Sequence, residues 1–112
     1  MSVAYGNRGE VYREKGELDK AMADLEQAVS LDPKNASALY SRGLGYRAKG
    51  EHDNAIADYD QAIKLDPKNA ATIYNSRSHA NYEKRDYEKA IQDLNQAIRL
   101  NPRYTLAIYN RA

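Results

Sequence analysis

The sequence predicts an all-α fold in which antiparallel helical hairpins stack side by side as an α-solenoid. Two observations lead to this prediction. Proline-containing segments recur along the 112 residues at Pro33, Pro67 and Pro102, with spacings of 34 and 35 residues. Between them, small and apolar residues recur three and four positions apart, so they share one face of a helix. A fixed period of this length is typical of stacked repeats.

Each repeat contains two predicted helices joined by a short turn. In the first repeat, Tyr5, Arg8 and Tyr12 lie on one helix face and Gly16 ends that helix. The second helix carries an apolar stripe and ends before Pro33, because the residue before proline avoids the helical region. The same pattern predicts helices over 36–49, 52–65, 70–84 and 87–100, and the start of a fourth repeat over 104–112.

Small residues occupy equivalent places in the three repeats, where neighbouring helices would approach closely. These places are held by Ala21, Ala55 and Ala90, and again by Ala28, Ala62 and Ala97. Since one hairpin cannot bury its own apolar stripe, the hairpins must stack on one another.

These residues resemble the tetratricopeptide repeat: a 34-residue period, Gly9 before Tyr12, Ala21 before Leu25, then Ala28 and a closing Pro33. The resemblance covers essentially the whole chain and its style resembles bacterial members. It implies one domain over 1–112, with repeats 2–34, 35–68 and 69–103 and a partial repeat 104–112. It further implies a right-handed superhelix whose concave groove, lined mainly by first helices, holds a peptide or helix of a partner protein.

Composition and charge disfavour several other functions. With 17 basic and 16 acidic residues interleaved, the chain lacks the charge pattern of a nucleic-acid binder. No apolar run approaches the roughly 20 residues that span a bilayer. The N-terminus lacks a signal-peptide core, so a cytoplasmic location is expected unless a leader lies outside this sequence. There is no cysteine, His52 and His79 fall in different repeats, and no catalytic constellation is present. We therefore expect no enzyme activity, cofactor or metal.

The outward positions of the first helices differ from repeat to repeat, as a ligand surface can, whereas the packing positions are alike. Aromatic and arginine side chains among them would be the energetic anchors of a bound peptide. The candidate groove residues are Asn7, Glu10, Arg13, Tyr40, Ser41, Leu44, Arg47, Asn75, His79 and Tyr82.

One subtype of this family grips the C-terminal carboxylate of chaperones through lysines, asparagines and an arginine. Here Gly6 and Glu10 stand where a lysine and an asparagine are needed, and Tyr40 and Leu44 stand there in the next repeat. The sequence therefore predicts no chaperone-tail clamp.

Two rows of charged residues also recur. Arginine occupies one place in each repeat, and aspartate occupies one place on each complete second helix: Arg8, Arg42, Arg77 and Arg111, with Asp24, Asp58 and Asp93. The arginines could line a groove for an acidic ligand, or each could pair with its aspartate. Their equal spacing favours a ladder of Arg–Asp pairs tying helix to helix.

The third repeat is irregular in two respects. It carries one extra residue between Pro67 and Arg77, which could form a π-bulge or, as we favour, a longer turn. Asn81 stands where the other repeats have Tyr12 and Tyr46. In an apolar seam its amide needs a hydrogen-bond partner, or it costs about 1–3 kcal/mol.

The last predicted helix has no second helix to cover its apolar residues, Tyr104, Leu106, Ile108 and Tyr109. Uncovered apolar surface marks an interface. The leading interpretation is an adaptor that binds a protein or peptide in its groove. The alternative is a structural spacer that forms a homo-oligomer through its terminal helices.

Overall fold

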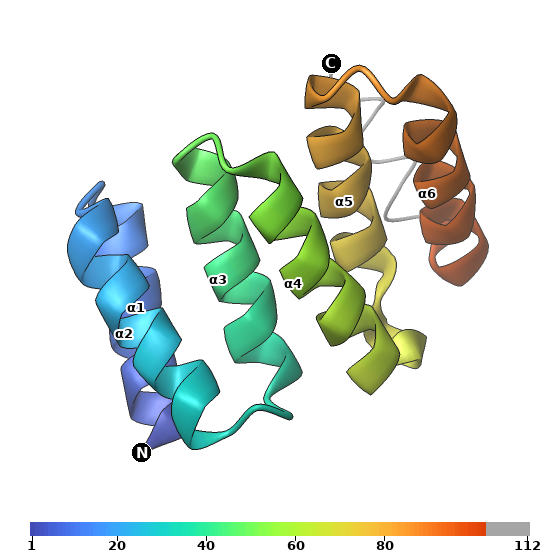
Figure 1. Ribbon diagram of the computed structural model, residues 1–112. Coiled ribbons are helices and arrows are strands. Elements are labelled where there is room, and N and C mark those ends of the chain that lie inside the picture. Colours follow the sequence, from blue (N-terminus) through green and yellow to red (C-terminus); the bar gives the residue numbers. More distant parts are fainter. Residues whose placement is uncertain (103–112) are drawn as a thin grey trace.

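The computed structural model describes residues 1–102, and these form three antiparallel helical hairpins in a row (Figure 1). The first hairpin pairs α1 (Ser2–Glu14) with α2 (Leu18–Leu31). The second pairs α3 (Ala36–Ala48) with α4 (His52–Leu65), and the third pairs α5 (Ala71–Glu83) with α6 (Tyr87–Leu100). The predicted all-α solenoid is confirmed, and the predicted helix limits agree with these within about one residue.

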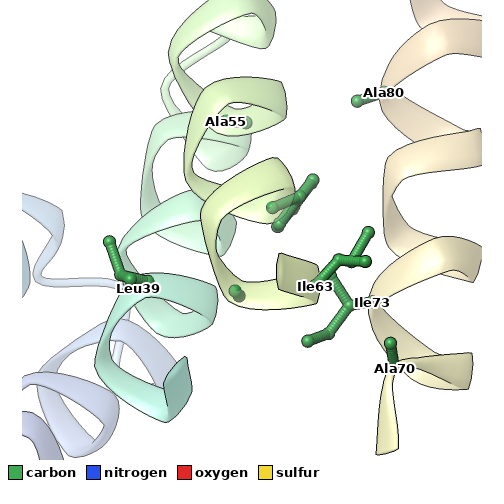
Figure 2. Packing of buried hydrophobic residues seen from close by; sticks show 8 residues of the cluster. Leu39, Ala55, Ile63, Ala70, Ile73 and Ala80 are labelled. Carbon is green, nitrogen blue, oxygen red and sulfur yellow. The ribbon is translucent and has the colours of Figure 1, made fainter. Parts of the chain in front are cut away.

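Stacking occurs where the second helix of one hairpin meets the first helix of the next, at the α2–α3 and α4–α5 junctions. A cluster of buried hydrophobic residues lies around α3, α4 and α5 (Figure 2). There Ile63 of α4 packs beside Ile73 of α5, while Ala55 and Ala62 are completely buried. All six of the repeated alanines are buried, as expected of small residues where neighbouring helices approach closely.

The extra residue of the third repeat lies in the turn between α4 and α5. That turn includes a short 3₁₀ helix, η1 (Pro67–Asn69), and is followed by Ala70, which is fully buried. Helix α5 has 13 residues, as α1 and α3 do. The longer turn, and not a π-bulge, therefore absorbs the insertion and keeps the three first helices equivalent.

The turn inside each hairpin requires a left-handed residue. Gly16 and Gly50 adopt it with φ of 83° and 80°, and Arg85 adopts it in the third hairpin with φ of 66°. A side chain in this region crowds its own backbone, which costs about 1–2 kcal/mol.

None of the helices in residues 1–102 is long and apolar enough to cross a membrane.

Replacing Arg85 with glycine should raise the free energy of unfolding by about 1 kcal/mol, because the strained backbone is relieved at an exposed position. Chemical denaturation followed by circular dichroism measures the change. Gly50→Ala is the matched control and should lower stability by a similar amount. A destabilised Arg85→Gly variant would show that the arginine side chain contributes more than its backbone costs.

Candidate functional site

The three first helices form one continuous row. Helix α1 contacts α3, and α3 contacts α5, and both contacts are larger than any between two second helices. A row of closely spaced helices backed by more widely spaced ones curves toward the close side, and stacked repeats use such inner surfaces for binding. We therefore expect the residues of α1, α3 and α5 that point away from the second helices to face this inner surface.

A first hollow lies between α1 and α3. Its volume is about 140 Å³, and small residues leave room at Gly6 of α1 and at Ser37 and Ala38 of α3. Its remaining walls are mostly polar: Val3, Asn7, Glu10, Asn35 and Ser41. Amide and hydroxyl groups of this kind can donate hydrogen bonds to a peptide backbone and accept them from it, and the Glu10 carboxylate can accept them.

A second hollow, of about 310 Å³, lies between α3 and α5. Ser37 lines this hollow as well as the first, so the two adjoin across α3. Its other walls are Ala36, Tyr40, Asp66, Asn69, Thr72 and Ile73. The two hollows meet at Ser37 and between them touch all three first helices, and together they are called the groove below.

Polar contacts tie neighbouring first helices together along this groove. The Tyr40 hydroxyl and the Ser76 hydroxyl are 2.8 Å apart, and the Arg47 guanidinium donates to Glu83 at 2.9 Å. Within α1, Arg13 donates two hydrogen bonds of 3.0 Å to the Glu10 carboxylate. Both arginines are therefore already paired with carboxylates, and neither lines the two hollows.

The Arg13–Glu10 and Arg47–Glu83 pairs affect which side chains of the first helices are charged at neutral pH. Hydrogen bonds from Arg13 lower the pKa of Glu10, and those from Arg47 lower the pKa of Glu83, so both carboxylates are charged at neutral pH. The pKa of His79 is lowered mainly by burial and secondarily by the charge of Arg47, which keeps its ring neutral at pH 7. The first helices thus present paired charges and a neutral His79 ring.

Family models match along most of the chain. Residues 9–46 match a model described as "TPR repeat", and residues 36–69 and 71–104 each match a model described as "Tetratricopeptide repeat". The chain belongs to the tetratricopeptide repeat family. A search of curated protein sequences gave no match.

Solved structures share the fold, and two of those described here are named as TPR domains. The Arabidopsis OM64 TPR domain superposes with a TM-score of 0.89 at 22% identity, covering 98% of this chain and 91% of that one. The first TPR of Spaghetti (RPAP3), bound to the HSP90 peptide SRMEEVD, gives 0.86 at 22% identity over 90% and 79% of the two chains. MamA gives 0.86 at 28% identity, and the match covers 93% of this chain but 60% of MamA.

In this tetratricopeptide repeat chain the predicted groove residues differ in accessibility. Tyr40 and Leu44 are partly buried and pack against the main core cluster. Ser41 and Asn75 are buried and lie beneath the surface of the row. Asn7 is exposed, and Tyr82 is 63% exposed and makes an edge-to-face contact with Tyr87 of α6. Asn7, Glu10, Ser41 and Tyr40 are the predicted residues that line the two hollows.

Sequence reasoning missed the contribution of the turns. Asn35, Asp66 and Asn69 line the hollows from the segments that precede α3 and α5. Asn35 caps α3 by accepting a hydrogen bond of 3.1 Å from the Ala38 amide, and its own amide donates to Ser2. An asparagine directly before a helix is a recognisable capping signal, and it could have indicated this position.

The Arg–Asp ladder is confirmed in all three described hairpins. Each arginine donates to both oxygens of the aspartate 16 residues later, with shortest distances of 2.7 Å in the first hairpin and 2.8 and 2.7 Å in the next two. The pairs are Arg8–Asp24, Arg42–Asp58 and Arg77–Asp93. The arginines are therefore committed to structure and do not line the groove. Arg111 lies outside the described residues.

The partner required by Asn81 is Asp93, whose carboxylate accepts a hydrogen bond of 3.0 Å from the asparagine amide. Arg77 gains an additional bond in this hairpin, a 2.6 Å contact to Asp60 of α4. The irregular third repeat is thus held by a polar network that joins α4, α5 and α6.

The residues predicted for self-association, Tyr104, Leu106, Ile108 and Tyr109, lie outside the described residues, so that prediction stays untested. Within residues 1–102, α6 exposes the apolar side chains of Tyr87, Ile91 and Ile98. Their equivalents on α4 include Ile63, which is buried against the next hairpin. The α6 face therefore continues the stacking surface of the repeat.

Proposed function

We propose that this chain is an adaptor that binds an extended peptide segment of a partner protein in the groove along α1, α3 and α5. The observation that carries the proposal is Ser37, which lines both hollows and so joins them into one path across three helices. An extended peptide can cross several helices in succession, whereas separate hollows would each hold only one side chain.

The lining of the two hollows indicates which peptides fit. It includes the carboxylates Glu10 and Asp66 but no lysine or arginine. Charge complementarity favours neutral or basic partner segments, because an acidic peptide would meet Asp66 and because Arg13, the cation beside Glu10, is already paired. The RPAP3 domain binds the acidic peptide SRMEEVD. We expect this chain to reject that peptide, in line with its missing clamp residues.

The Ser37→Trp variant tests whether peptides bind in the groove. Ser37 is exposed, and the substitution places a large ring where the two hollows meet. Peptides selected from a random phage-displayed library on the wild-type chain are measured by fluorescence anisotropy. The variant should weaken binding by about tenfold or more, because one blocked hot-spot region costs about 1.4 kcal/mol or more.

Ser30→Trp is the matched control, since Ser30 is an exposed serine on α2, away from the groove. It should bind the selected peptides as the wild type does, and both variants should keep the wild-type melting temperature. Equal affinity of Ser37→Trp and Ser30→Trp would contradict the groove as the binding site. Saturable binding of synthetic SRMEEVD would contradict the charge argument.

A further inference from the structure

The third hairpin lacks a ring that the other two possess. Tyr12 and Tyr46 occupy one equivalent place on α1 and α3, and Asn81 occupies it on α5. Asn81 is buried, with only 5% of its surface exposed, and its amide is held by Asp93. An asparagine fills less space than a tyrosine, so the place of the phenol ring is left open.

In each of the first two hairpins a cationic side chain lies over the tyrosine ring at this place. The Lys20 ammonium lies 5.6 Å from the centre of the Tyr12 ring, and the Arg42 guanidinium lies 5.7 Å from the centre of the Tyr46 ring. Both distances are within the range of favourable cation–π contacts. Burial raises the pKa of Tyr46, so its hydroxyl stays neutral in this place.

The same cations are present in the third hairpin without the ring. Arg77 and Lys89 are the equivalents of Arg42 and Lys20, and both line a hollow of about 270 Å³ between α4, α5 and α6. Ile56, Asp60, Asn81 and Gln92 are among its other walls. A cavity of about 150 Å³ suffices to hold a benzene molecule, so the hollow has room for a phenol ring.

We infer that this hollow binds a phenol ring, namely the tyrosine side chain of a protein that docks on the second-helix side of the stack. Arg77 is fixed for this contact, because Asp93 and Asp60 both accept hydrogen bonds from its guanidinium and the centre of the Tyr74 ring lies 5.2 Å from its central carbon. A cation that is already ordered loses little freedom on binding. Ile56 supplies an apolar wall for the ring, as expected of a partly hydrophobic site.

This site is separate from the groove. The hollow is built from α4, α5 and α6, whereas the groove is built from α1, α3, α5 and the turns between them, and the two share no lining residue. The inference therefore does not depend on the proposed function, and either can fail while the other stands.

The test uses p-cresol, the side chain of tyrosine, as the probe. Titration into the full chain followed by ¹H–¹⁵N NMR should give saturable shifts of the Asn81 side-chain amide and the Arg77 Nε–H. Asn81→Tyr should abolish these shifts, because it restores the ring of the other two hairpins and fills the hollow. Absence of saturable shifts in the wild type, or equal p-cresol binding by Asn81→Tyr, would overturn the inference.

A second variant keeps the test valid if Asn81→Tyr folds poorly. Lys89→Ala removes an exposed cation over the proposed ring and should weaken p-cresol binding by about threefold. Lys68→Ala, an exposed lysine in η1, is the matched control and should have no effect. Equal binding of 4-methylcyclohexanol and p-cresol would overturn the requirement for an aromatic ring.

Discussion

Replacing Asp58 with alanine is expected to lower the free energy of unfolding by about 3 kcal/mol. The Asp58 side chain is 7% exposed and accepts two hydrogen bonds of 2.8 Å from Arg42, whose side chain is 22% exposed. Without the carboxylate, a poorly solvated guanidinium stays unpaired between α3 and α4. Removing one member of a buried ion pair destabilises a protein far more than replacing both members with apolar residues does.

This change is large enough to measure by thermal unfolding. In a chain of this size about 1 kcal/mol shifts the melting temperature by about 4 °C or more, so Asp58→Ala should lower it by more than about 10 °C. Asp53→Ala is the control, because Asp53 is 82% exposed and pairs with Lys84 at the surface. It should change stability by less than about 1 kcal/mol. Similar melting temperatures for the two variants would disprove the structural role of the ladder.

A double variant distinguishes the cost of an unpaired buried charge from the stability that the ion pair itself contributes. Replacing Arg42 by methionine together with Asp58 by leucine removes both charges and keeps comparable volume. Since a desolvated ion pair can be replaced by apolar residues with little loss, the double variant should recover most of the stability that Asp58→Ala loses. The middle hairpin is the suitable place for this cycle, because Arg8 of the first pair is 60% exposed.

The fold could be predicted because every hairpin repeats the same helix-ending residues and the same small packing residues. Helix ends follow from local chemistry, such as Gly16 and the residue before Pro33, and the alanines at close crossings recur at fixed spacing. The Arg–Asp ladder could be predicted for the same reason, since two charges that recur together at one separation imply a contact. Repetition turns one local inference into three mutually supporting ones.

The groove was less predictable because it depends on contacts between different hairpins. Nothing in the sequence pairs Tyr40 with Ser76 or Arg47 with Glu83, since these contacts arise from the angle at which hairpins stack. Tyr40 is consequently a poor probe of binding alone: its removal would also break a hydrogen bond and expose core. Ser37, another outward residue of α3, is exposed and lines both hollows, so it is the better probe.

The hollow beside Asn81 illustrates the same limit. The replacement of tyrosine by asparagine was visible in the sequence, and so was the need of its amide for a partner. The sequence could not show whether neighbouring side chains would close over the missing ring. In the folded chain Asp93 satisfies the amide but the space stays open, because Arg77 is held away by Asp60 and Asp93.

Replacing Gly43 with alanine is expected to lower the free energy of unfolding by about 2 kcal/mol, although alanine is the better helix former. A Cβ atom at this position would lie 2.6 Å from Cε1 of Tyr59 and 3.3 Å from the carbonyl oxygen of Ala55. Tyr59 is completely buried and packs against Tyr40, with 5.7 Å between the ring centres, so its ring cannot move aside without disturbing the core cluster.

Gly6→Ala provides the matched control with the opposite expected sign. Gly6 also lies within a first helix, but its new Cβ would meet only Ala28 Cβ, at 3.9 Å, which is an ordinary contact. The gain of about 1 kcal/mol from replacing a helical glycine should therefore appear undiminished, and Gly6→Ala should stabilise the chain. Urea denaturation of both variants decides the matter: if Gly43→Ala were as stable as Gly6→Ala, the close α3–α4 crossing would not be what requires glycine at position 43.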